Sequence, residues 1–158
     1  MAGDTGKVSA RLTELAITLP PVAAPVAAYV PAVQAGDLVF TSGQLPFTDG
    51  ALPATGAVGE GAAVTPPDAT SYARTATLNA LAAIDDLVGI DNVRQIVKVV
   101  GFVASAPGFG GQPAVVNGAS DLLGEIFGEA GAHARSAVGV AELPLGSPVE
   151  VELIVRVA

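Results

Sequence analysis

The 158-residue chain contains no cysteine, no tryptophan and only one histidine. Without cysteine, no disulfide, thiolate nucleophile or thiolate-bound metal can form. A single histidine excludes a multi-histidine zinc site within one chain, and also a pair of histidines acting as acid and base. Aromatic residues make up only 4% of the chain, so a base-stacking platform for single-stranded nucleic acid is not expected.

Charge is also scarce, at 14% of the residues, whereas hydrophobic residues reach 51%. A chain of this composition is expected to fold, and its length suits one domain with a sizeable core. With 7 basic and 15 acidic residues the formal net charge is -8. Nucleic acid would be repelled on average, because its binding depends on basic side chains. So few charges also suggest that partner subunits cover part of the surface.

Residues 15–36 form an uncharged stretch that is long enough to be considered as a membrane span. Each proline inside a helix costs about 3 kcal/mol, and this stretch contains Pro20, Pro21, Pro25 and Pro31. Upstream of it, Asp4 and Glu14 interrupt what would have to be a basic secretion leader. We therefore expect a cytoplasmic protein with no membrane partner.

Residues 1–24 are interpreted as an N-terminal extension and residues 25–158 as a single domain. Helical turns are expected over 11–17, and an extended proline-rich arm over 18–36. Helical spacing and the Thr65 cap predict a helix over 66–88, and a second helix runs from Pro113 to Gly128. Strands are predicted at 37–43, 92–105, 133–141 and 149–157, with a loop over 44–64. This order predicts an α+β domain with both helices on one face of the sheet.

The way in which the last two strands pair decides on which face of the sheet the candidate polar residues lie. If these strands form a hairpin, the valines of the first share a face with Val151 and Leu153. Arg135 and Glu150 then emerge together on the other face, where the small Ala137 leaves room above the backbone. In a plain hairpin the two charged residues are still about 10–20 Å apart. A bulge, their long side chains or a neighbouring subunit would have to close that gap.

Several stretches of the chain resemble the Rid/YjgF family of 2-iminobutanoate/2-iminopropanoate deaminases, which also carries the label endoribonuclease L-PSP. The resemblance covers about residues 25–158, and its motifs are specific in combination. They are residues 37–46 (DLVFTSGQLP), 73–81 (ARTATLNAL) with 91–98 (DNVRQIVK), and 133–144 (HARSAVGVAELP) with 149–152 (VEVE).

The resemblance implies a chorismate-mutase-like fold of the bacillus type, with a mixed sheet and two helices on one face. It also implies a homotrimer whose sheets form a central barrel, with three pockets between subunits. The family's deaminases hydrolyse reactive enamine or imine acids, such as 2-aminoacrylate and 2-iminopropanoate, to 2-keto acids and ammonia. No metal or organic cofactor is implied, and the expected small-molecule partner is an imino or keto acid.

Matched residue by residue, the family's carboxylate-binding arginine falls on Arg135 and its acidic residue on Glu150. An arginine fork donates two parallel, charge-assisted hydrogen bonds to a carboxylate. The glutamate could deprotonate water and return the proton to departing ammonia. Backbone N–H groups near Gly43 or Ala137 could polarise the substrate. The family's other pocket positions fall on Tyr29, Ser42 and Asn117, and a family cysteine is replaced by Ala137.

Plainer interpretations of these residues stay open. Arg135 could form a surface salt bridge, Glu150 could belong to a solvated strand face, and Tyr29 could anchor the arm. Ser42 could be a turn residue, Asn117 could begin a helical turn, and His133 could be structural. The alanine at position 137 also leaves room for a non-catalytic trimer that binds a small carboxylate in a regulatory role. An endoribonuclease or translation inhibitor has less support, given the charge.

Overall fold

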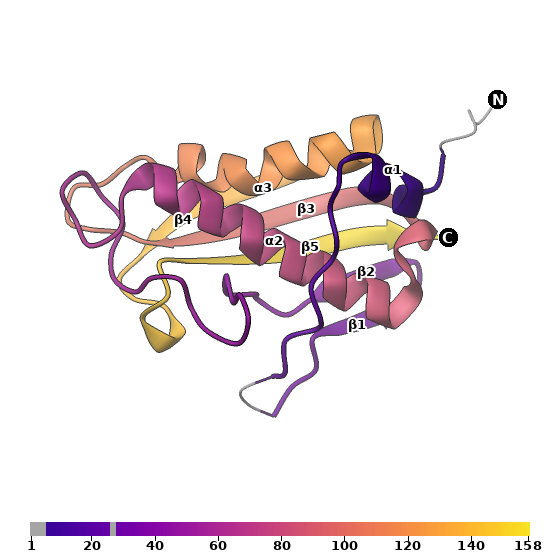
Figure 1. The fold of residues 1–158 in the computed structure, drawn as a ribbon, viewed down its shortest axis with the longest axis horizontal. Helices are drawn as coiled ribbons and strands as arrows, with labels where there is room; N and C mark the ends of the chain where they lie inside the picture. The colour runs from indigo at the N-terminus through magenta and orange to yellow at the C-terminus, as the bar shows by residue number, and fades with distance from the viewer. Residues whose placement is uncertain (1–5, 26–27) are drawn as a thin grey trace.

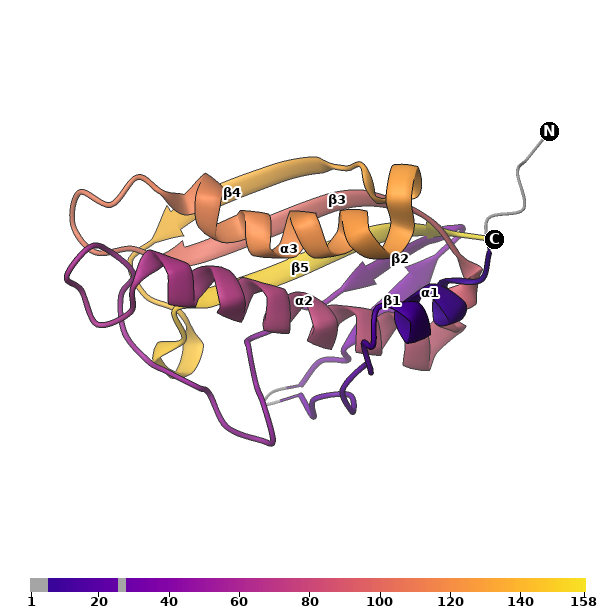
Figure 2. The same cartoon turned by 45° about the horizontal axis from the view of Figure 1, so that its top comes forward.

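The computed structural model describes residues 6–25 and 28–158. Two long helices lie side by side across one face of a five-stranded sheet (Figures 1 and 2). The helices are α1 (Val8–Glu14), α2 (Pro66–Val88) and α3 (Gln112–Phe127). The strands are β1 (Ala32–Ala35), β2 (Leu38–Thr41), β3 (Val93–Ala104), β4 (Ala134–Val140) and β5 (Val149–Val157). The predicted α+β class, with both long helices on one face, is confirmed.

The strand order is β1-β2-β5-β3-β4, with β4 parallel to β3 and the other pairs antiparallel. The predicted hairpin between the last two strands is therefore wrong, because β3 lies between them. Parallel neighbours need a crossover connection, and α3 supplies it between β3 and β4. After β4 the chain passes β3 and enters the sheet between β3 and β2.

The core lies between the sheet and the two long helices. Alternate residues of β5, from Val149 to Val157, are buried against the helices, while the residues between them face the other way. Helix α2 contributes mostly alanines to this core, and small side chains allow close packing. Helix α3 packs closely as well, because Gly118 lies against the backbone carbonyl of Thr70 in α2.

The boundaries of α2 follow from local chemistry. Thr65 accepts a hydrogen bond from the Asp68 N–H at 3.3 Å, and Pro66 occupies the first helical position. Gly89, with φ of 82°, ends the helix in a conformation that L side chains rarely adopt. The predicted helix over 66–88 is confirmed at both ends.

The N-terminal segment is more structured than predicted. Helix α1 begins at Val8, before the expected start at Arg11, and it buries Leu12. The Ser9 N–H and hydroxyl both donate to the carboxylate of Asp91, at 2.8 and 2.7 Å. The expected arm over 18–36 also contains β1, which turns through Gly36 into β2. This strand was missed because its sequence, AVQA, has little β-branched character.

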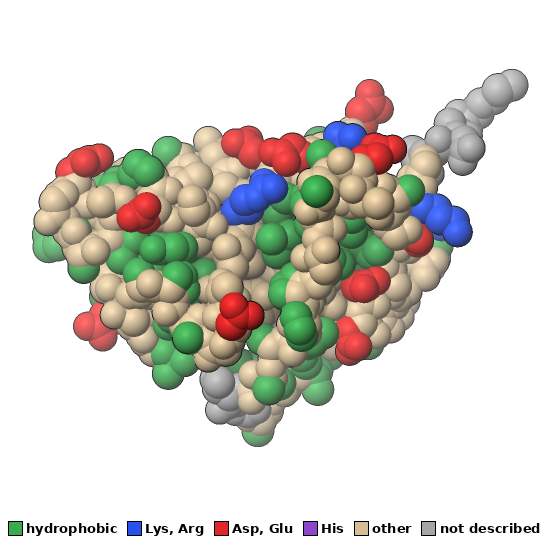
Figure 3. All heavy atoms as spheres, in the orientation of Figure 1, with side chains coloured by type: hydrophobic (Ala, Val, Ile, Leu, Met, Phe, Trp, Pro, Cys, Tyr) green, Lys and Arg blue, Asp and Glu red, His purple; other side chains and the backbone are tan. Residues whose placement is uncertain are grey.

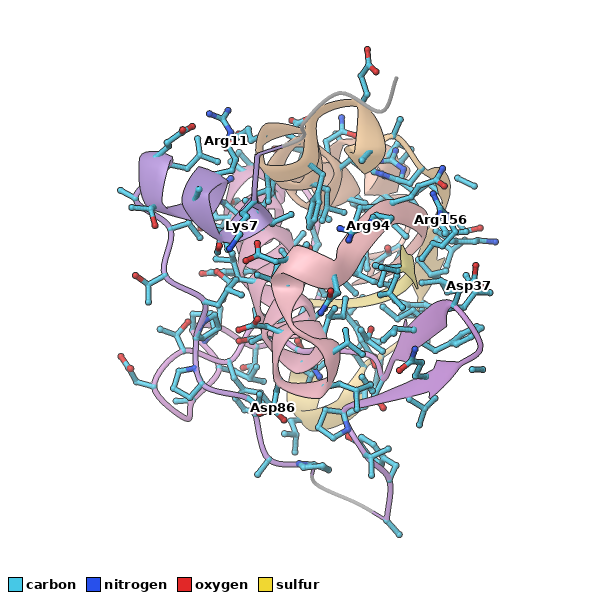
Figure 4. The ribbon with its side chains drawn as sticks, turned by 90° about the vertical axis from the view of Figure 1, so that its right-hand side faces the viewer. Lys7, Arg11, Asp37, Asp86, Arg94 and Arg156 are labelled. Atoms are coloured by element: carbon cyan, nitrogen blue, oxygen red, sulfur yellow. The ribbon has the colours of Figure 1, made fainter. Side chains whose placement is uncertain are left out.

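Basic and acidic side chains lie together at one end of the described part of the molecule. Lys7, Arg11, Arg94 and Arg156 lie at one end of the molecule, where Asp37 and Asp86 lie as well (Figure 4). On the face shown in Figure 3, acidic side chains are scattered among apolar ones. Within residues 6–25 and 28–158, no helix is both long and apolar enough to span a membrane.

Candidate functional site

Arg135 lies on the edge strand β4, and its guanidinium reaches the N-terminal half of α3. Nη1 donates to Asn117 Oδ1 at 2.7 Å and to Ser120 Oγ at 3.2 Å, and Nη2 donates to the Pro113 carbonyl at 3.3 Å. A guanidinium has five N–H donors. The Nε–H and one Nη2–H therefore have no acceptor among the described residues, and no carboxylate there pairs with Arg135. Two free donors are the number that a bound carboxylate uses.

Ser120 and His133 extend this cluster, and the sequence analysis assigned neither a role in it. His133 Nδ1 lies 2.6 Å from the Gly131 carbonyl, which can only accept, so Nδ1 carries a proton. When the ring is neutral, Nε2 accepts from the Ser120 hydroxyl, 2.9 Å away. The Ser120 oxygen in turn accepts from Arg135. The available signal was the position of Ser120 three residues after Asn117, on the same face of a helix.

If Arg135 binds a small carboxylate ligand such as a keto acid, replacing Ser120 with alanine should weaken that binding by about 3–10-fold, because Arg135 loses one hydrogen bond to a neutral hydroxyl, worth roughly 0.5–1.5 kcal/mol. Calorimetric titration with pyruvate measures the change. Ser71→Ala is the matched control, since that exposed hydroxyl donates only to a carbonyl of its own helix. Equal affinity in the Ser120 variant and the wild type would show that the hydroxyl does not orient the guanidinium.

Glu150 lies on β5, on the sheet face opposite the helices. Gly43 lies directly beneath it, and a Cβ at residue 43 would clash with the Glu150 carboxylate. Burial raises the pKa of Glu150 above its ordinary value of 4.5, and the nearby negative charge of Glu152 raises it further. A half-buried glutamate with a raised pKa is the kind of group that can accept a proton and return it during a reaction.

The raised pKa of Glu150 gives a stability effect with a definite sign. The folded state holds this proton more tightly than the unfolded state, so the resulting stabilisation is present below about pH 4.5 and is lost as pH rises through the folded pKa. Glu150→Gln should therefore gain stability relative to wild type between about pH 4 and pH 7. Urea unfolding at both pH values, at one protein concentration, measures this. In a Glu152→Gln background, which lacks the neighbouring negative charge, the gain in stability from Glu150→Gln should be smaller. A stability difference between Glu150→Gln and wild type that is the same at both pH values would contradict the raised pKa of Glu150.

Arg135 and Glu150 lie on opposite faces of the sheet, so their expected common face was wrong. Arg135 is in register with Val99 of β3 and Leu153 of β5, both buried under the helices. Glu150 is in register with Phe102 and, beyond it, Val138. The expected phase assumed that β4 pairs with β5, whereas β3 separates them. Two strand spacings and three residue positions separate the two backbones by about 14 Å.

Tyr29, Ser42 and Gly43 gather on the Glu150 side of the molecule. The Ser42 hydroxyl donates to the Val30 carbonyl at 2.6 Å, which ties the segment next to Tyr29 to β2. Tyr29 is 47% exposed and shares a small concavity with Gly43 and Gln44. The candidate residues thus form two clusters, one around Arg135 and Asn117 and the other around Glu150, Gly43 and Tyr29.

Ala137 lies two residues after Arg135 on the same face and packs against the core beneath α3. Its methyl group offers no reactive atom. Within the described part of the chain, no group of three or more histidine, aspartate or glutamate side chains is placed to hold a metal ion.

A mixed sheet with two helices on one face, and an arginine restrained at its edge strand, define an α+β protein of the chorismate-mutase-like class. Residues 9–157 match the family described as "YjgF/chorismate_mutase-like, putative endoribonuclease". The chain belongs to this YjgF family.

Known proteins are similar to this chain in sequence and structure over most of its length. Protein TCP17 of Trypanosoma cruzi is 43% identical over 154 residues, covering 96% of this chain and 95% of that protein. The crystal structure named as a "putative endoribonuclease" from Shewanella oneidensis MR-1 is 34% identical, with a TM-score of 0.90 over 96% of this chain and 100% of that one. The structure of E. coli TdcF with bound serine is 29% identical, with a TM-score of 0.59 over 89% of this chain and 94% of that one.

Proposed function

We propose that the protein hydrolyses small 2-imino acids, of the 2-aminoacrylate and 2-iminopropanoate type, to 2-keto acids and ammonia. The observation that carries this proposal is Arg135, which three hydrogen bonds hold in place while two of its N–H donors have no acceptor among the described residues. The relative TdcF, whose structure contains serine, supports the choice of ligand class. Serine, like a 2-imino acid, carries a carboxylate next to a carbon that bears nitrogen.

A homotrimer is part of this proposal, because within a single protomer Arg135 and Glu150 lie on opposite faces of the sheet and cannot share one site. The sheet face that carries Glu150 is not covered by the two long helices, and it exposes apolar side chains such as Val33, Phe40 and Val138. Exposed apolar surface of this kind is typical of a subunit interface. Packing these faces between copies would allow the Arg135 cluster of one protomer to meet the Glu150 cluster of the next.

In this composite site Arg135 holds the substrate carboxylate, so the C=N carbon lies one bond further out. Glu150 accepts a proton from a water molecule as the water oxygen bonds to that carbon, and the C=N electron pair moves to nitrogen, which takes up a proton. The carbinolamine then collapses to the ketone as the C–N bond breaks, and its hydroxyl proton passes to solvent water, which supplied the proton that nitrogen took up. The proton held by Glu150 goes to the departing ammonia, which restores the carboxylate.

Decay of enzymatically generated 2-aminoacrylate tests the activity. Wild-type protein should accelerate loss of the imine and production of pyruvate above the buffer rate, and Glu150→Gln should be much slower while still binding pyruvate. Gel filtration with light scattering tests the trimer. Wild-type protein that leaves the imine decaying at the buffer rate would exclude the deaminase.

A non-catalytic trimer that binds a small carboxylate is the second candidate. The alanine at position 137 favours it, because this residue packs into the core and gives a ligand no reactive group. Calorimetry with pyruvate and 2-oxobutanoate separates the two candidates: binding without imine turnover supports this one, and absence of binding excludes it.

Endoribonuclease activity appears in the descriptions of the family and of relatives. It has little support here, because the net charge is -8 and two of the basic residues pair with glutamates. RNA cleavage that persists through repurification and is lost in Arg135→Ala would establish it.

A further inference from the structure

We propose a second ligand site, for a small apolar molecule that carries an ammonium group, beneath the N-terminal arm. A cavity of about 700 Å³ lies where the arm crosses α2, and this volume is within the usual range for small-molecule sites. Apolar side chains gather along the arm on the face shown in Figure 3. The arm supplies residues 18 and 20–24, α2 supplies Thr75, Leu78 and Asn79, and the loop after β2 supplies residues 47–50.

The buried amide of Asn79 points to a ligand with a hydrogen-bond donor. Asn79 is only 3% exposed, and its Nδ2 donates to the carbonyls of Leu45 at 2.9 Å and Phe47 at 3.1 Å. Because both carbonyls can only accept, the amide nitrogen must face them and the oxygen must point away. Among the described residues nothing donates to that oxygen, so it can still accept a hydrogen bond from a bound molecule.

The free oxygen of Asn79 opens onto this cavity. In the described part of the chain, every fully covered side-chain nitrogen or oxygen has a hydrogen-bond partner. The Asn79 oxygen has none there, so it cannot be fully covered, and the cavity is the open space that Asn79 lines. A ligand N–H or O–H could take the place of water on this oxygen and complete the hydrogen bonding of the amide.

The charge of the residues that line the cavity indicates which kind of ligand donor group it would bind. Asp49 is the one ionisable residue among those that line the cavity, and no lysine, arginine or histidine is among them. It lies on the turn closed by the Thr48 N–H and the Ala51 carbonyl, with φ of 52°. The remaining walls are largely apolar and include Val22, Phe47 and Leu78. An ammonium group fits these two acceptors, whereas a carboxylate would be repelled.

This site differs in charge and place from the proposed imino acid site, and it does not depend on that function. The one ionisable residue among the described residues that line it is an aspartate, whereas Arg135 is a cation. The two regions meet at the arm, because Ala23 and Ala24 also border the concavity that contains Tyr29 and Gly43.

Three probes of similar size test the proposal: 2-phenylethylamine, 2-phenylethanol and 3-phenylpropanoate. In calorimetric titrations at neutral pH the amine should bind best, the alcohol more weakly and the carboxylate not at all. Amide chemical shifts of residues 22–24, 48–50 and 75–79 should move with the amine. Asp49→Asn keeps a residue type that adopts the same turn conformation. It should weaken binding of the amine by about 2–5-fold, as expected for loss of an exposed ion pair, and leave binding of the alcohol unchanged.

Thr75→Phe fills the cavity from α2 and should abolish binding of both the amine and the alcohol. Asp86→Asn, at the far end of the same helix, is the control and should have no effect, and Arg135→Ala should also leave amine binding intact. The proposal is overturned if no probe binds, if the carboxylate binds as well as the amine, or if Thr75→Phe binds like wild type. Loss of amine binding in Arg135→Ala would show that the amine binds at the Arg135 site, and this result would also overturn the proposal.

Discussion

Replacing Arg135 with lysine is expected to lower kcat/KM for 2-iminopropanoate hydrolysis by roughly 30–1,000-fold. Lysine keeps the positive charge but loses the planar fork that can bind a carboxylate through two parallel hydrogen bonds. Losing one to two charge-assisted hydrogen bonds corresponds to roughly 2–4 kcal/mol, and each 1.36 kcal/mol is about tenfold in rate. Lysine also cannot keep the three hydrogen bonds to Asn117, Ser120 and Pro113 while reaching a ligand.

Initial rates of imine loss and calorimetry with pyruvate measure the effect of Arg135→Lys on turnover and on binding. Arg74→Lys is the matched control. Arg74 Nη1 lies 3.6 Å from Glu125 Oε2, and this ion pair belongs to neither the Arg135 cluster nor the Glu150 cluster. The substitution should therefore change neither turnover nor binding by more than about 2-fold. An Arg135 variant with wild-type kcat/KM and pyruvate affinity would show that this guanidinium does not hold the substrate.

Replacing Gly118 with alanine should destabilise the fold by about 2–4 kcal/mol, because overpacking a close backbone contact forces the helices apart. A Cβ at this position of α3 would overlap the backbone carbonyl of Thr70 in α2, which cannot move aside like a flexible side chain. The better helix propensity of alanine offsets at most about 1 kcal/mol of this cost. For a chain of this length the melting temperature should fall by very roughly 4–16 °C.

Gly124→Ala is the control within the same helix, because nothing lies within 4 Å of a Cβ at that position. Alanine there should raise stability by about 0.5–1 kcal/mol through helix propensity alone. Thermal unfolding of the two variants therefore should give shifts of opposite sign. Equal shifts would mean that the contact between α2 and α3 at Gly118 is not tight.

Local signals in the sequence predicted most elements well. Helix α2 was predicted at both ends, because Thr65, Pro66 and Gly89 act on the backbone within a few residues of themselves. Strand β5 was also predicted over its full length, since its alternating valines report burial on one face. Strand β1 was missed, because its short sequence has little intrinsic strand preference and it forms by pairing with β2.

The candidate site was predicted less evenly. Asn117 contacts Arg135 and Gly43 lies beside Glu150, but within one protomer these two pairs lie on opposite faces of the sheet. The common face of Arg135 and Glu150 was wrong, because alternation along each strand says nothing about which strand lies next to it. Ser120 was missed because its contacts with His133 and Arg135 arise only when α3 packs beside β4.

The α+β class, the bounds of the main helices and the exclusion of cysteine chemistry could be predicted from the chain alone, because these depend on composition and on neighbours within about one helical turn. The folded molecule was needed to show that β3 lies between β4 and β5, which faces carry Arg135 and Glu150, and that Asn79 lines a cavity under the arm. Those outcomes depend on strand order and on contacts between residues tens of positions apart, which periodicity along one strand or helix does not encode.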